Sequence, residues 1–314
     1  MFKSYEGKVF GRNENGLLFN GRPIGNFAPA GPRGKVFFVD SQIDATEGTS
    51  PDTAVGTLDE AFALTTANQG DVIYVLPNHA ETVTGAGGVT HDVAGVSVIG
   101  LGVGNQRPRI LLDGGTAVTY LISAADAYVS GLELASGHAA VVTAVDVTAV
   151  NAHLENIKFS DNTTSEYFLN CVKASGAANT ADGLTITNCK YTTVEAATDF
   201  FTHTNAVDRL KINDNVYIAD AATTAGFILS ATTKILTNLE CLRNYFVCGN
   251  TSTDIFIDND ASTNTGIVAW NMVGHHDVAG AVIIDCDGVR LFQNYQVSSD
   301  TESGVLVPAA DTNT

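Results

Sequence analysis

An asparagine returns at near-regular intervals along the chain, and this recurrence constrains the fold more than any other feature. Successive copies, here called anchors, are 23 to 32 residues apart. The anchors are Asn156, Asn188, Asn215, Asn244, Asn271 and Asn294, with Gly100 and Gly131 in the same place upstream. Self-similarity at this period is typical of a solenoid, in which each repeat is one coil stacked on the next.

Apolar residues keep fixed offsets from the anchor. After Asn156, Ile157 follows by one place and Phe159 by three, which is the alternation of a β-strand. A second apolar strand comes about thirteen residues after each anchor, at 200–201, 227–229, 255–257, 282–284 and 305–307. The spacing therefore predicts two strand families. Between stacked coils, the six asparagines would pass amide hydrogen bonds along a structural ladder.

Composition limits the class of protein. Hydrophobic residues make up 45% of the 314 residues, but no apolar run approaches the length of about 20 residues that a membrane span needs. The start, MFKSYEGKVFGRNENG, lacks the apolar region of a secretory signal. Most of the five cysteines lie in apolar strand patterns, which favours reduced core thiols and folding in a cytoplasm.

Charge divides the chain into two parts. Residues 1–35 hold six basic and two acidic residues, a balance of +4, so the net charge of -18 leaves -22 on the rest. We interpret residues 1–35 as an N-terminal attachment arm and residues 36–314 as the solenoid body. An acidic body repels phosphate groups, so we expect neither nucleic acid nor membrane as a partner.

A short helix is predicted at the start of the body. Thr57-Leu58-Asp59-Glu60 is a capping box, and Gly70 follows the apolar residues after it. A helix in this place would cap the open end of the solenoid, whose apolar layer and strand edge otherwise favour aggregation.

Several runs in the body resemble one superfamily. They are FVDSQ, TLDEAFALTTANQGDVIYVLPNHAETV, GVSVIGLG, GLTITNCKY and GVRLFQNYQV. These runs look like the right-handed parallel β-helix, or pectate-lyase-like, superfamily, and the resemblance covers about residues 36 to 310. It implies an all-β, right-handed parallel β-helix with a short capping helix and an N-terminal arm. The superfamily includes polysaccharide lyases and hydrolases, phage tailspikes and inert virion parts, so the resemblance leaves the activity open.

The sequence offers few catalytic candidates. Pectate lyases of this superfamily pair calcium-binding acids with basic residues, but only ten Lys or Arg follow residue 35, and they share no common offset from the anchor. Two pairs of aspartates do share an offset. Asp258 and Asp285 lie fourteen places after their anchors, and Asp260 and Asp287 lie sixteen places after. We interpret these pairs as exposed turn aspartates; a cation site and a hydrolytic carboxylate pair are the alternatives.

The single tryptophan, Trp270, lies just before its anchor and is expected to point outward. An exposed tryptophan serves either as a packing or subunit contact or as a sugar-binding platform, and we favour the contact. No cofactor motif is evident in the sequence.

These features favour a non-enzymatic virion protein of a tailed phage, most simply a capsid decoration or cement protein on the capsid surface, assembled in the host cytoplasm. Its partner would be the major capsid protein or another virion protein, and we expect a homotrimer. The arm residues expected to bind the capsid are Phe2, Lys3, Lys8, Phe10, Arg12, Phe19, Arg22 and Arg33. The alternatives are a tailspike-type polysaccharide depolymerase and a glycan-binding receptor spike.

Overall fold

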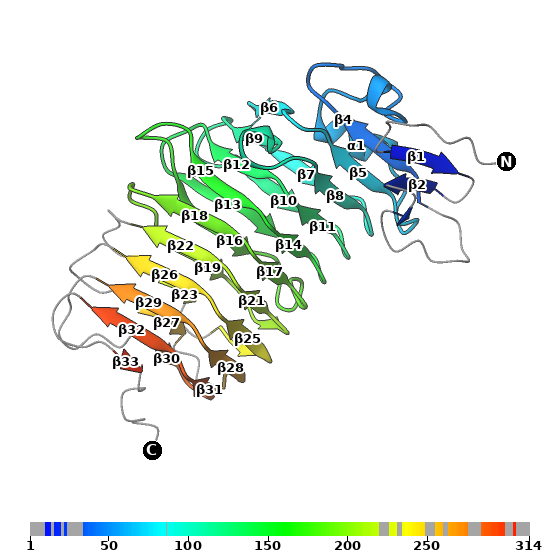
Figure 1. Cartoon of the computed structure of the whole chain (residues 1–314). Coiled ribbons are helices and arrows are strands. Elements are labelled where there is room, and N and C mark those ends of the chain that lie inside the picture. Colours follow the sequence, from blue (N-terminus) through cyan, green and yellow to red (C-terminus); the bar gives the residue numbers. More distant parts are fainter. Residues whose placement is uncertain are drawn as a thin grey trace.

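The chain winds into a parallel β-helix whose coils stack along one axis (Figure 1). The computed structural model describes residues 10–13, 16–19, 22–23, 34–85, 87–219, 226–230, 234–248, 255–259, 263–275, 284–298 and 304–305. Each regular coil contributes one strand to each of three sheets, here called sheets I, II and III in chain order. The structure thus confirms the predicted all-β parallel solenoid.

Sheet I contains β4 (Val36–Val39), β5 (Val72–Val75), β8 (Ser97–Gly100), β11 (Tyr128–Ser130), β14 (His153–Glu155), β17 (Thr185–Thr187), β21 (Lys211–Asn213), β25 (Leu239–Leu242), β28 (Gly266–Ala269) and β31 (Val289–Phe292). Sheet II contains β6 (Ala80–Val83), β9 (Arg109–Leu112), β12 (Glu133–Ser136), β15 (Lys158–Asp161), β18 (Lys190–Thr193), β22 (Val216–Ala219), β26 (Tyr245–Cys248), β29 (Met272–His275), β32 (Tyr295–Ser298) and β33 (Gly304–Val305).

Sheet III contains β7 (Val89–His91), β10 (Tyr120–Ile122), β13 (Val141–Val147), β16 (Phe168–Ala174), β19 (Asp199–His203), β23 (Gly226–Ser230), β27 (Ile255–Asn259) and β30 (Ile284–Cys286). Two small sheets pair β1 (Phe10–Asn13), β2 (Gly16–Phe19) and β3 (Arg22–Pro23), and β20 (Val207–Asp208) with β24 (Leu236–Thr237). The helices are η1 (Pro51–Thr53), α1 (Leu58–Leu64) and η2 (Gly104–Gln106).

The sequence predicted two strand families where the structure has three. From β11 and β12 onward, sheets I and II meet at a corner of two residues, such as Arg243 and Asn244 between β25 and β26. Because the corner is so short, the two strands read as one apolar run. The run predicted at 305–307 also differs: β33 pairs antiparallel with β32 at the edge of sheet II and is not part of sheet III.

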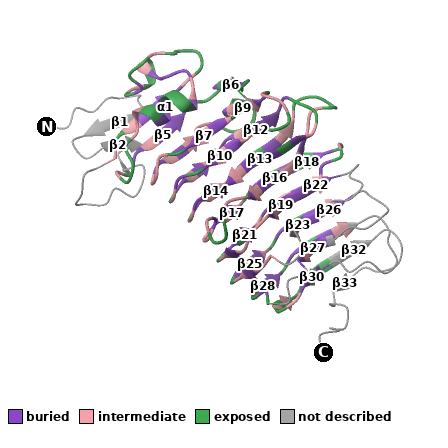
Figure 2. Cartoon of the chain, turned by 180° about the vertical axis from the view of Figure 1, so that it is seen from behind, coloured by how far each residue is buried: buried purple, intermediate pink, exposed green. Residues whose placement is uncertain are grey.

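Side chains in register fill the interior with continuous columns. Phe200, Phe227 and Phe256 stack with ring centroids 4.8 and 4.9 Å apart, which matches the spacing of neighbouring strands. Tyr191 and Tyr217 stack beside them with centroids 6.0 Å apart. Figure 2 shows the burial along the strands and the exposed residues concentrated in the turns. Burial of these columns supplies the main driving force for folding.

Helix α1 lies at the N-terminal end of the core, as the capping box predicted. Thr57 and Glu60 form the full box, and Leu58, Ala61 and Phe62 are buried in the main core. The backbone N–H of Leu58 also donates to the Glu81 carboxylate at 3.1 Å. The carboxylate thus lies at the N-terminal end of the helix, where the helix dipole favours negative charge. Among the described residues, no helix has the length and hydropathy needed to cross a membrane.

Candidate functional site

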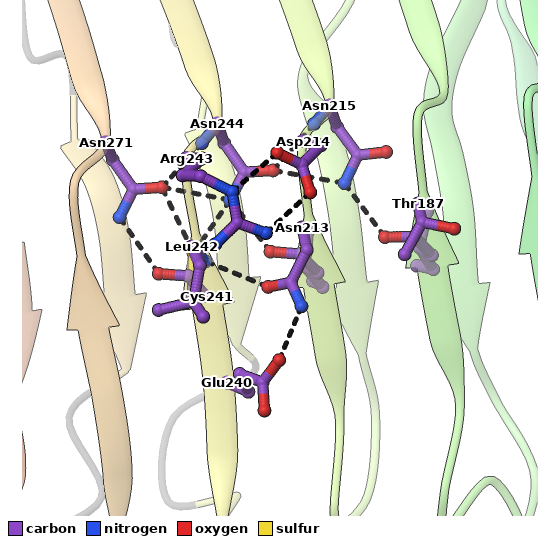
Figure 3. A network of polar contacts seen from close by, with 12 residues as sticks. Thr187, Asn213, Asp214, Asn215, Glu240, Cys241, Leu242, Arg243, Asn244 and Asn271 are labelled. Carbon is purple, nitrogen blue, oxygen red and sulfur yellow. Dashed lines mark hydrogen bonds and ion pairs between the residues drawn. The ribbon is translucent and has the colours of Figure 1, made fainter.

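Four of the predicted ladder asparagines, Asn215, Asn244, Asn271 and Asn294, are buried and bonded in one column. Figure 3 shows the first three of them. The Asn244 Oδ1 accepts the backbone N–H of Asn215 at 3.0 Å and its side-chain amide at 3.1 Å. The Asn244 amide in turn donates to the Ile212 carbonyl at 2.8 Å and to the Asn271 Oδ1 at 3.0 Å. Asn271 makes the same contacts with Asn294. The ladder therefore satisfies buried backbone groups at the corner between sheets I and II.

The ladder prediction was wrong for Asn156 and Asn188. Both are exposed and lie one place before the column, where strand register places Ile157 and Cys189 instead. Their φ angles of 54° and 55° put them in the left-handed region, which asparagine tolerates better than most residues. Asparagine therefore occurs at two neighbouring corner positions, one that needs a left-handed backbone and one that needs a buried amide. The sequence pattern did not separate the two positions.

In the following coils, residues other than asparagine occupy the same left-handed corner position. Asp214, Arg243, Trp270 and Gln293 have φ angles of 59°, 55°, 56° and 45°. Their side chains pair between coils: the Arg243 guanidinium donates twice to the Asp214 carboxylate, both at 2.7 Å, and the Trp270 indole donates to the Gln293 side chain at 3.0 Å. These pairs partly offset the backbone strain.

The aspartate pairs are only partly described. Asp258 and Asp285 are register partners on β27 and β30, as the common offset predicted, but the Asp285 side chain lies outside the described part. Asp260 also lies outside it, and Asp287 is half-buried in the turn after β30. Among the described residues, no group of three or more His, Cys, Asp or Glu is arranged to hold a metal ion.

The predicted attachment residues fall largely outside the described residues. Phe2, Lys3, Lys8 and Arg33 lie outside them altogether. Phe10, Arg12, Phe19 and Arg22 lie on β1, β2 and β3, for which only the backbone pairing is described; Phe10 pairs with Phe19, which pairs with Arg22.

One outward column of sheet II is charged in the N-terminal coils. Glu133 lies between two cations, with Lys158 Nζ at 3.1 Å and Arg109 Nε at 3.8 Å, and it also accepts the Ser160 hydroxyl at 2.8 Å. Lys190 continues the column and is exposed. This is the charged face expected of a strand exposed to water.

The same face becomes apolar from β22 onward. Its two outward columns carry Val216, Ile218, Tyr245, Val247, Met272 and Tyr295, here called the sheet II apolar face. Tyr245, Met272 and Tyr295 are 39%, 45% and 42% exposed. The outward positions of β22, β26 and β29 include no charged residue. Contiguous exposed apolar surface of this kind is typical of sites where proteins bind a partner or ligand.

Aromatic groups extend this face around the corner. Trp270 is 44% exposed, which agrees with its predicted outward position, and Phe292 on β31 is 50% exposed. Their rings meet edge to face with centroids 5.7 Å apart. The sequence indicated the outward position of Trp270 but not the exposure of Tyr245 and Tyr295. The alignment of Asn156 and Asn188 with Asn244 and Asn294 had grouped these tyrosines with the buried Ile157 and Cys189.

A buried carboxyl lies at the first residue of β19 in sheet III. Asp199 on β19 is 5% exposed, and burial, with a smaller contribution from Asp258, raises the pKa of Asp199 to about 7. Asp161 at the end of β15 accepts the Tyr191 and Thr193 hydroxyls, both at 2.6 Å, and burial raises its pKa as well. Carboxyls with raised pKa values can act as proton donors where a substrate reaches them.

No family model matches the chain, and no curated protein matches it. Among solved structures, a rhamnogalacturonan lyase is similar over 87% of this chain and 90% of that chain, with 13% identity and a TM-score of 0.44.

Proposed function

We propose that this chain is a non-enzymatic structural protein of a tailed-phage virion, a decoration or cement protein on the capsid surface. It would act by association with protein surfaces, through residues 1–35 toward the capsid and through the sheet II apolar face toward further copies of itself. The observation that carries this proposal is the uncharged apolar face on an otherwise acidic rod.

Charge favours a second copy as the occupant of that face. The chain carries a net charge of -18, so two copies repel each other over most of their surface. The outward residues of β22, β26 and β29 are uncharged, so this is where like-charged copies can approach without opposing carboxylates. Exposed tyrosine and methionine side chains are also typical of interface cores.

Sedimentation of charge variants tests the self-association. We expect the wild-type protein to sediment as an oligomer, with a trimer as the expected state, and Tyr245→Lys/Met272→Lys to sediment as a monomer. Both side chains are partly exposed, so the substitutions should not prevent folding. Thr192→Lys, on the polar half of the same face, is the matched control. A monomeric wild-type protein would contradict this step.

Particle binding tests the capsid role separately. Charge reversal at Lys3, Lys8 and Arg12 to Glu should abolish co-sedimentation with capsids, because the basic arm is expected to meet an acidic shell. The oligomeric state should not change. Full binding by the charge-reversed protein would refute attachment through the arm.

Polysaccharide cleavage is the second candidate. The pKa of about 7 at Asp199 favours it, since glycosidases use a carboxylic acid that stays protonated near neutral pH. Release of new reducing ends from a glycan panel, lost in Asp199→Asn, would establish this activity. Glycan binding without cleavage, weakened by Trp270→Ala, would instead indicate a receptor-binding spike.

A further inference from the structure

The outer face of sheet I is apolar in the first coils. Val36, Phe38, Val72, Tyr74, Ile99 and Leu101 gather there on β4, on β5 and on and just after β8, here called the sheet I patch. In the following coils, Ser130, Glu155 and Thr187 occupy the column that Phe38, Tyr74 and Ile99 begin. The change from apolar to polar side chains along one column implies that the first coils are covered and the later ones face water.

Two patch residues are already largely buried. Phe38 is 7% and Tyr74 is 9% exposed, although Phe37 and Ile73 beside them point into the core. Ala54, from the loop before α1, packs on this cluster and is fully buried. The loss of water around the Tyr74 hydroxyl raises the pKa of Tyr74.

The chain enters the body beside this patch at a fixed point. The buried Asp71 carboxylate accepts the backbone N–H of Lys35 at 2.6 Å and that of Thr66 at 2.7 Å. Gly34 lies so close to the next coil that a Cβ there would come within 1.9 Å of the Gly70 carbonyl oxygen. Residue 34 is thus held at the start of β4, so the preceding 33 residues begin beside the patch.

That preceding segment contains apolar residues and a small sheet. Strands β1, β2 and β3 pair antiparallel over Phe10–Asn13, Gly16–Phe19 and Arg22–Pro23. An isolated sheet of this size is marginally stable in water and needs an apolar surface to pack on. Leu17 and Leu18 add to the apolar residues available for such packing.

We propose that residues 1–33 fold back and pack the β1–β2–β3 sheet on the sheet I patch of the same chain. Tether length and exit point favour this occupant, because the segment begins next to the patch and its effective concentration there is high. The inference does not depend on the virion role. It places the arm at the N-terminal end of the rod as a docked element.

Limited trypsin digestion of the full chain tests the docking. The peptide bonds after Lys8 and Arg12 should be cleaved at least tenfold faster in Ile99→Asn/Leu101→Asn than in the wild-type protein, because the patch variant releases the segment. Leu121→Asn, a half-buried position on the outer face of sheet III, is the matched control and should keep the wild-type rate. Circular dichroism melting confirms that both variants are folded at the digestion temperature.

Each outcome bears on the proposal. Wild-type cleavage at the rate of an unstructured peptide, or equal rates in the patch variant, would overturn it. Protection that falls on dilution of the wild-type protein would assign the patch to a second copy and would also overturn it. Faster cleavage of the patch variant at every protein concentration would support docking within one chain.

Discussion

At the residue scale, a ladder asparagine such as Asn244 connects three coils. Asn244 accepts from Asn215 and donates to Ile212 and Asn271, and all of these contacts are buried. Removal of its side chain would leave several backbone and amide groups without partners. Such groups are costly because water cannot replace the lost hydrogen bonds.

We therefore predict that Asn244→Ala lowers the free energy of unfolding by about 2–4 kcal/mol, since it leaves more than one buried polar group without a partner. Chemical denaturation measures the effect. Asn188→Gly, at the exposed left-handed position, is the control and should change stability by less than about 0.5 kcal/mol, because glycine adopts positive φ without strain. Equal effects at the two positions would contradict the separation of the two columns.

Asp199 should give the protein an acid-favoured stability component. Its raised pKa means that the folded state holds a proton that the unfolded state releases between pH 3.8 and about 7. This contribution is fully present below pH 3.8 and is lost as pH rises to 7, at up to about 1.4 kcal/mol per pH unit. Burial lowers the pKa of His91 to about 4, which gives an opposite slope over part of this range.

The difference between wild type and Asp199→Asn isolates the Asp199 contribution from that of His91. We expect the stabilising effect of the wild-type carboxyl, relative to the variant, to decline from about pH 4 to about pH 7. Urea denaturation at several pH values measures it, with the exposed Asp52→Asn as control. A difference that is independent of pH would show that the carboxyl is not protonated in the fold.

Asparagine identity alone could not place these residues. Asn156 and Asn215 both stand near the same corner, yet one provides a left-handed turn and the other a buried amide. A shift of one residue inverts the side-chain alternation of a strand. The buried aromatic residue is two places after Asn215, at Tyr217, but three places after Asn156, at Phe159. This difference in offset is the signal that separates the two columns.

At the element scale, α1 is short and depends on its cap. A helix of seven residues has little stability of its own, so the capping box and the buried Leu58 and Phe62 hold it on the core. The element was predictable because the Thr57 and Glu60 pattern is local. Sheet I was not recognised as a separate family, because its strands join those of sheet II through a two-residue corner.

Thr57→Ala should destabilise the protein by about 1 kcal/mol through loss of the cap. Hydrogen exchange of the α1 amides should speed up more than exchange in sheet III, because the change is local. Thr116→Ala, at an exposed turn position, is the control. Uniform acceleration throughout the coils would contradict a local role.

At the scale of the whole molecule, charge and shape act together. Acidic residues outnumber basic ones by 34 to 16. The rod form follows from the anchor period and was predictable. The sheet II apolar face was not predictable. Its recognition requires the correct strand register in the C-terminal coils, and the asparagine alignment placed these coils one residue out of register with the N-terminal ones.

Self-repulsion at this net charge should make stability depend on salt. We expect the melting temperature to rise by several degrees as NaCl increases from about 20 mM to about 500 mM, where screening shortens to roughly 4 Å. Sucrose at matched osmolality is the control for effects not due to ions. A melting temperature that falls with salt would indicate that ion pairs such as Glu133–Lys158 outweigh the repulsion.

The five cysteines, Cys171, Cys189, Cys241, Cys248 and Cys286, are all buried and reduced. Burial raises the pKa of Cys171, Cys189 and Cys241, so little reactive thiolate forms at these positions. A single cysteine engineered onto an exposed turn would therefore take up a maleimide dye selectively in the native protein. Fluorescent labels could then report distances along the rod without removal of any natural thiol.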